Sequence, residues 1–163
     1  MNIIRFLLFG LALTFGCVKH PLATNPNIQN TFQPKPYTGP DSTALDLLRT
    51  SENGPRIFVQ AKFPNGDDGL FMVDTGAAIS TLSEKTAERL GLALERNYGS
   101  VEGLGGTSNF HRTTLPTLGL GDARLSDVEF AVGVRGVPEF AYFMPLDGIL
   151  GNNVWSHFTL EID

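Results

Sequence analysis

Glycine is the feature that most limits how this chain can fold. The sequence has 18 glycines, many of them at turn-like positions between short apolar segments. Glycine weakens helix interiors and favours turns, so this spacing suits short strands better than long helices. Apolar residues make up 42% of the 163 residues, enough for the core of one domain. The sequence therefore predicts a single all-β domain.

A predicted β-hairpin opens the folded domain, which we place at residues 55–163. Residues 56–63 alternate apolar and polar side chains with the period of two that is typical of a half-buried strand. Residues 64–68 supply turn chemistry, and residues 69–73 return as an apolar strand that ends at Asp74. Further strands are predicted at residues 99–102, 109–118, 123–124, 127–133 and 158–162.

Two short helices complete the predicted secondary structure. Residues 83–90 fit a helix with Ser83 as its N-cap and Gly91 as its stop. Residues 41–50 fit a second helix capped by Asp41, because three of its apolar residues would share one side.

The first residues resemble an export signal. Arg5 and the α-amine give a positively charged start, and residues 6–15 are apolar, a length that fits a signal peptide and is short for a membrane span. Gly16-Cys17 resembles a bacterial lipobox, so Cys17 is a candidate lipidated N-terminus, with an ordinary cleaved signal as the alternative.

We therefore predict a signal peptide over residues 1–16. Residues 17–54 are predicted as a flexible tether, because much of this segment is polar and proline-rich without periodicity. The expected location is the cell envelope, either in the periplasm or at a membrane through the lipid anchor alone.

An aspartate after an apolar strand carries the chemistry. A carboxylate in that place is costly unless it is hydrogen-bonded or protonated, so Asp74 stands where a function would justify the cost. The plainer alternative is an Asx turn, in which Asp74 only caps the following backbone. The run Asp74, Thr75, Gly76, Ala77 resembles the catalytic loop of the aspartic peptidases, an apolar strand followed by Asp-Thr-Gly and a small residue.

Two further motifs extend the resemblance, which is strongest to the exported, single-domain retropepsin-like peptidases of bacteria. Where that family has a mobile flap, this chain has Gly103, Leu104, Gly105 and Gly106, for which a plain glycine turn is the alternative. Where the family packs two hydrophobic residues and a glycine beneath the catalytic loop, this chain has Ile149, Leu150, Gly151 and Asn152. The resemblance implies a closed or partly open β-barrel lobe with one or two short helices.

The resemblance also implies a homodimer that cleaves polypeptides. Hydrolysis needs one group to deprotonate water and another to protonate the substrate oxygen, and the chain has one Asp-Thr-Gly. Two ionised carboxylates about 4 Å apart at an effective dielectric of about 20 repel by about 4 kcal/mol, so one proton stays on the pair. We expect activity on the acidic side of neutrality. Residues 158–162 stand where retroviral peptidases place the strand that pairs with the partner. Asp147 lacks a following Thr-Gly and is interpreted as a turn residue.

Composition argues against several other functions. The net charge is -5 and the basic residues are scattered, so nucleic acid is a poor partner. With one cysteine and three separated histidines, we predict neither a metal site nor a cofactor. Two alternatives stay open: a catalytically silent module of the same fold that binds peptides or proteins, and one lobe of a longer two-lobed peptidase.

Overall fold

The structure is a computed structural model that describes residues 3–7, 37–50, 56–103, 106–134, 140–141 and 144–162. The strands of the first half are β1 (Ile3–Leu7), β2 (Tyr37–Thr38), β3 (Ala44–Thr50), β4 (Arg56–Lys62), β5 (Asp68–Val73) and β6 (Ser80–Leu82). Those of the second half are β7 (Glu95–Gly103), β8 (Gly106–Leu120), β9 (Ala123–Val132), β10 (Phe140–Ala141), β11 (Met144–Pro145), β12 (Gly148–Leu150) and β13 (Thr159–Ile162). The helices are α1 (Glu84–Arg89) and α2 (Asn152–Trp155).

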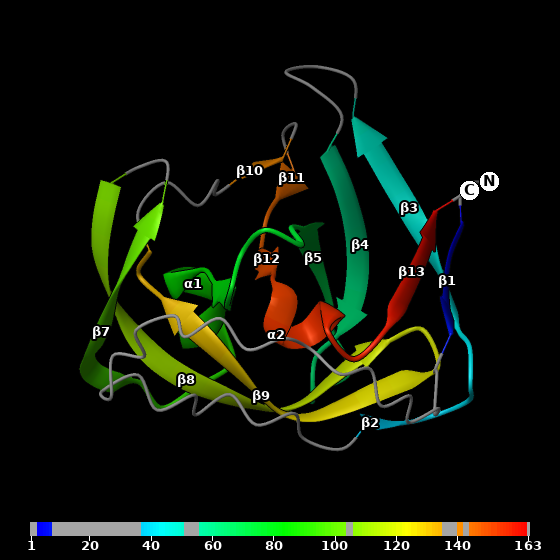
Figure 1. Cartoon of the computed structure of the whole chain (residues 1–163). Coiled ribbons are helices and arrows are strands. Elements are labelled where there is room, and N and C mark those ends of the chain that lie inside the picture. Colours follow the sequence, from blue (N-terminus) through cyan, green and yellow to red (C-terminus); the bar gives the residue numbers. More distant parts are fainter. Residues whose placement is uncertain are drawn as a thin grey trace, which may run out of the picture.

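One large sheet organises the described residues (Figure 1). Its strand order is β13-β1-β3-β4-β5-β12-β6-β9-β8-β7, and β2 pairs with β9 outside this path. A further pairing of β4 with β8, at Lys62 and Gly119, joins two strands that are far apart in that order. The six strands from β4 to β8 therefore curl into a partly closed barrel. This confirms the predicted all-β lobe with one or two short helices, although α2 was not among the predicted elements.

The barrel encloses a single main hydrophobic core. The long β8–β9 hairpin lines it with alternating side chains, and β4, β5 and β12 close it from the other side. Phe71 is fully buried in this core, and its ring centroid lies 5.8 Å from that of Phe63 and 6.2 Å from that of Phe130. Because β12 lies between β5 and β6, the strand that leads to Asp74 is held within the barrel wall.

Most of the predicted elements after residue 55 are confirmed. The predicted hairpin is β4–β5, and α1 is capped as expected, with the Ser83 hydroxyl accepting the Thr86 N–H at 3.1 Å and Gly91 at a φ of +63°. The strands expected at 123–124 and 127–133 are the single strand β9, in which Asp127 has a φ of +51°. Neither described helix is long and apolar enough to cross a membrane.

The helix predicted at residues 41–50 is wrong, because most of this segment is strand β3. Thr43 and Leu45 are buried and Leu47 is half-buried, while the residues between them are exposed. That period-two pattern fits a strand, and β3 pairs antiparallel with β4 along the edge that faces away from β5. Within the tether expected over residues 17–54, residues 37–38 pair with β9 and residues 44–50 pair with β1 and β4.

The N-terminal predictions concern processing, and they stay predictions. Within the predicted signal peptide, residues 3–7 form β1, which pairs antiparallel with both β3 and β13. Cys17 lies outside the described residues.

Candidate active site

Asp74 is the first residue beyond β5 and is anchored through its backbone. Its N–H donates to the Leu150 carbonyl at 3.1 Å, which extends the parallel pairing of β5 with β12 by one bond. The same carbonyl accepts the indole N–H of Trp155 at 2.6 Å. The point at which the chain leaves β5 is therefore fixed from beneath by β12 and α2.

The half-buried Asp74 carboxylate is oriented by the loop that follows it. Oδ1 accepts the Gly76 N–H at 2.9 Å and the Ala77 N–H at 3.2 Å. A Cβ on Gly76 would lie 3.2 Å from Oδ1, so glycine lets this backbone approach closely. The Asx turn that the sequence left as the plainer alternative is thus present.

The turn leaves part of the carboxylate unused. No described residue donates a hydrogen bond to Oδ2 of Asp74, and the neighbouring Thr75 is exposed. An oriented carboxylate with one oxygen available is able to accept a proton from a water or share one with a second acid.

The motif at residues 149–152 lies against this loop. The Asn152 N–H donates to the Ala77 carbonyl at 2.7 Å. A Cβ on Gly151 would stand 2.8 Å from that carbonyl oxygen and 2.7 Å from the Ile79 carbonyl carbon. Glycine is therefore required where α2 meets the loop, and Ile149 and Leu150 are buried in β12 beside it.

A buried polar cluster under the loop was not predicted. The Ser80 hydroxyl donates to Asn153 Oδ1 at 2.7 Å and accepts the Gly151 N–H at 2.9 Å. Asn153 Oδ1 also accepts the Ser80 N–H at 2.7 Å, and its Nδ2 donates to the Glu129 carbonyl at 2.9 Å. A sequence signal for this cluster exists, because Asn153, which has an amide side chain, directly follows the motif at residues 149–152. The cluster joins β6, α2 and β9 and completes the support of the loop.

The predicted flap lies at the tip of the β7–β8 hairpin. Gly103 pairs with Gly106, which is exposed and has a φ of +89°, while Leu104 and Gly105 lie outside the described residues. Near the base of the hairpin, Phe110 packs with Ile79 and Ala131 in a small apolar cluster. The hairpin therefore packs against Ile79, two residues beyond the Asp74–Ala77 loop.

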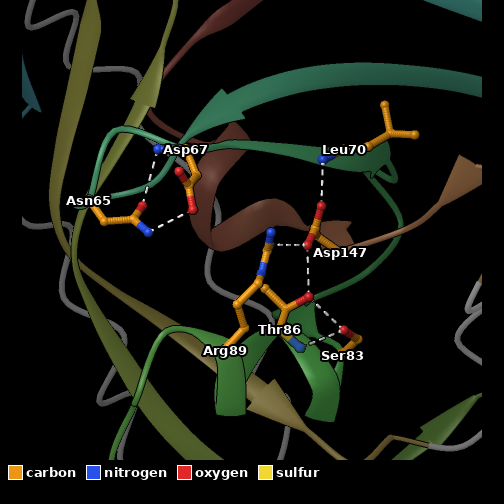
Figure 2. Close-up of polar contacts among 7 residues, drawn as sticks. All are labelled: Asn65, Asp67, Leu70, Ser83, Thr86, Arg89 and Asp147. Carbon is orange, nitrogen blue, oxygen red and sulfur yellow. Dashed lines mark hydrogen bonds and ion pairs between the residues drawn. The ribbon is translucent and has the colours of Figure 1, made fainter.

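Asp147 has a larger role than that of a turn residue. Its two carboxylate oxygens accept hydrogen bonds from Leu70, Thr86 and Arg89 (Figure 2). Both oxygens are thus engaged within the chain, whereas Oδ2 of Asp74 accepts no hydrogen bond from a described residue. Among the described residues no group of three or more His, Cys, Asp or Glu is placed to hold a metal ion.

Comparisons with known proteins bear on the family and the fold of the chain. The family model described as aspartyl protease matches residues 59–154, more than half of the chain. Among solved structures, a retropepsin-like aspartic protease from Rickettsia conorii is similar at a TM-score of 0.50 and 20% identity, over 71% of this chain and 80% of that one. No protein with a curated description matches the sequence. The matched segment contains Asp74, its supporting loop and the motif at residues 149–152, and the chain belongs to the aspartyl protease family.

Proposed function

We propose that the protein is an aspartic endopeptidase that acts as a homodimer, with one Asp74 carboxylate from each subunit. The observation that carries the proposal is the oriented Asp74 carboxylate, with Oδ1 held by two backbone N–H groups and Oδ2 free of donors among the described residues. Its loop is supported from below by β12 and α2. Family membership adds the reaction class.

In the proposed reaction, one carboxylate of the pair is ionised and its twin is protonated. The ionised group takes a proton from water as the water oxygen attacks the substrate carbonyl carbon, and the twin gives its proton to the carbonyl oxygen. The tetrahedral diol then transfers a proton to the amide nitrogen, and the C–N bond breaks. The pair ends with one shared proton, ready for the next water.

A second chain is the economical source of the second carboxylate. Asp147 is engaged by three donors in its own chain, and the sequence has no second Asp-Thr-Gly. A two-fold axis would place identical loops face to face, with the exposed Thr75 hydroxyl available to the opposite loop. The substrate is a polypeptide held beside the β7–β8 hairpin, and the site of action is the cell envelope.

Asp74→Asn tests the catalytic assignment. This variant keeps the size and the Asx-turn acceptor of the side chain but removes the acid. We expect kcat/KM for an unstructured protein or fluorogenic peptide to fall at least about 1,000-fold across about pH 4 to 7. Asp122→Asn, in the exposed β8–β9 turn, serves as the control and should retain activity. Unaltered turnover by a folded Asp74→Asn protein would contradict the assignment.

Mixing the two forms tests the homodimer. After subunit exchange, equal amounts of wild type and Asp74→Asn should leave about one quarter of the activity of the same total of wild type, because mixed dimers have one acid. Independent monomers would leave about half. Wild-type protein that binds peptides tightly but cleaves none would instead favour a silent binding module.

A further inference from the structure

Asp147 joins three parts of the fold through its side chain (Figure 2). The side chain is 16% exposed. Oδ2 accepts the Leu70 N–H of β5 at 2.8 Å. Oδ1 accepts the Thr86 hydroxyl and an Arg89 guanidinium N–H, each at 2.7 Å. The carboxylate, which lies just before β12, therefore connects β5 to α1.

The backbone of Asp147 strengthens the same connection. Its N–H donates to the Leu70 carbonyl at 2.9 Å, so Asp147 and Leu70 share two hydrogen bonds across 77 positions of sequence. Its carbonyl accepts the N–H of Ser83, the N-cap of α1, at 2.7 Å. Both contacts are made immediately before β12 begins.

The pairing that starts beside Asp147 ends at Asp74. Gly148 pairs with Phe71, Leu150 pairs with Val73, and the Asp74 N–H then bonds to the Leu150 carbonyl. Parallel strands have no tight turn between them to set their register. A slip of one residue would move β5 by about 3.3 Å and reverse its faces. The bonds of Asp147 therefore fix one end of a short ladder whose other end holds the proposed catalytic acid.

We propose that Asp147 is a positioning residue, which sets the register of β5 against β12 and thereby the place of Asp74. The inference rests on the proposed function, because the place of Asp74 sets the distance between the two Asp74 carboxylates of the proposed dimer. At an effective dielectric of about 20, widening that separation from about 4 Å to about 6 Å would weaken the repulsion between the two ionised carboxylates by about a third, so the pH range over which the pair holds a single proton would narrow.

Asp147→Asn is a discriminating variant. Asparagine keeps the size of the side chain, but an NH2 group replaces one of the two acceptor oxygens. Either the Leu70 N–H or the donors from Thr86 and Arg89 would then face that NH2 group and lose their acceptor. We expect kcat to fall about 100-fold, with KM within about threefold of wild type. The acidic and basic limbs of the kcat profile against pH should move toward each other by about one unit.

Asp68→Asn is the matched control. It also removes a carboxylate from β5, one that pairs at 2.8 Å with Lys62 where both side chains are about half exposed (51% and 49%). Its kcat and pH limbs should equal those of wild type. Thr86→Val removes one donor to Asp147 with little change of shape and should shift the limbs in the same direction as Asp147→Asn, by less.

A merely structural role predicts a different result. Asp147→Asn would then have a lower melting temperature and a smaller folded fraction, while kcat per folded molecule and both pH limbs stayed at wild-type values. That outcome would overturn the inference, and if Asp147→Asn does not fold, wild-type limbs in Thr86→Val would do so.

The two proposals fail in distinguishable ways. Cleavage by Asp74→Asn overturns the proposed function and this inference with it. An inactive Asp74→Asn together with wild-type kinetics in Asp147→Asn overturns the positioning role alone.

Discussion

His157, just beyond α2, links the stability of the site's support to pH. Partial burial lowers the pKa of His157 below its usual 6.5, and a hydrogen bond with the Asn153 backbone opposes that effect. Its ring meets the Phe158 ring edge-on, with centroids 6.3 Å apart. The neighbouring α2 carries Asn153, part of the buried cluster beneath the Asp74–Ala77 loop.

We expect acid to weaken the fold through this side chain. The unfolded chain takes up the His157 proton near pH 6.5 and the folded chain at a lower pH, so the unfolded state holds more protons between the two values. The contribution of His157 to the free energy of unfolding is full above pH 6.5 and is lost as pH falls through its folded-state pKa. His157→Gln should therefore lose less melting temperature than wild type on acidification from about pH 7 to pH 5. Parallel curves of melting temperature against pH would contradict this.

Residues with local roles could be predicted, and residues with distant partners could not. Asp74 stands in a motif that is continuous in sequence, and Ser83 caps α1 by accepting the N–H of Thr86, three residues away. In contrast, Asp147 reaches Leu70 across 77 positions, and Ser80 reaches Asn153 across 73. Nothing near either residue specifies such a partner, because the sheet topology brings them together.

At the scale of elements, β12 shows how little room the site allows. This strand pairs in parallel with β5 and antiparallel with β6. A Cβ on Gly148 would overlap the Thr81 carbonyl oxygen, and its next contacts are also backbone atoms. No side chain is able to rotate away to relieve that overlap.

Gly148→Ala should therefore force β12 and β6 apart. We expect the free energy of unfolding to fall by about 3 kcal/mol or more, because overpacking against backbone is costly. Gly99→Ala is the control, since its added methyl would meet only the Phe110 ring edge at 3.2 Å, and it should cost less than about 1 kcal/mol. Urea unfolding followed by tryptophan fluorescence of Trp155 measures both. Equal losses in the two variants would show that the close approach at Gly148 is unimportant.

The type of an element depends on its neighbours as well as on its own residues. Residues 44–50 fit both a helical and an alternating pattern, and they form a strand because the edge of β4 offers backbone hydrogen-bond partners. By contrast, α1 has its cap and stop within its own sequence, and so it was predicted correctly. The barrel strands were found where alternation and glycine turns agree, whereas three-residue strands such as β6 are too short to show a period.

For the whole molecule, the sheet end opposite the β7–β8 hairpin bears on assembly. β13 pairs only with β1 among the described strands, and β1 also pairs with residues 44–46 of β3 (Figure 1). β1 lies inside the predicted signal peptide. Removal of residues 1–16 would thus leave β13 and part of β3 with unpaired edges, separated by the width of one strand.

We expect such edges to pair with a second copy, because unpaired backbone donors and acceptors template strand addition. A chain without residues 1–16 should sediment at twice the monomer mass, with self-association at least about tenfold tighter than in the full chain. Leu160→Pro in β13 should return the shortened chain to a monomer, because proline cannot donate to the strand ladder. Peptide cleavage should appear in the dimer and be lost in the Leu160→Pro monomer, because the proposed site needs one Asp74 from each subunit. A shortened chain that stays monomeric and cleaves peptides at full rate would contradict both the edge pairing and the shared site.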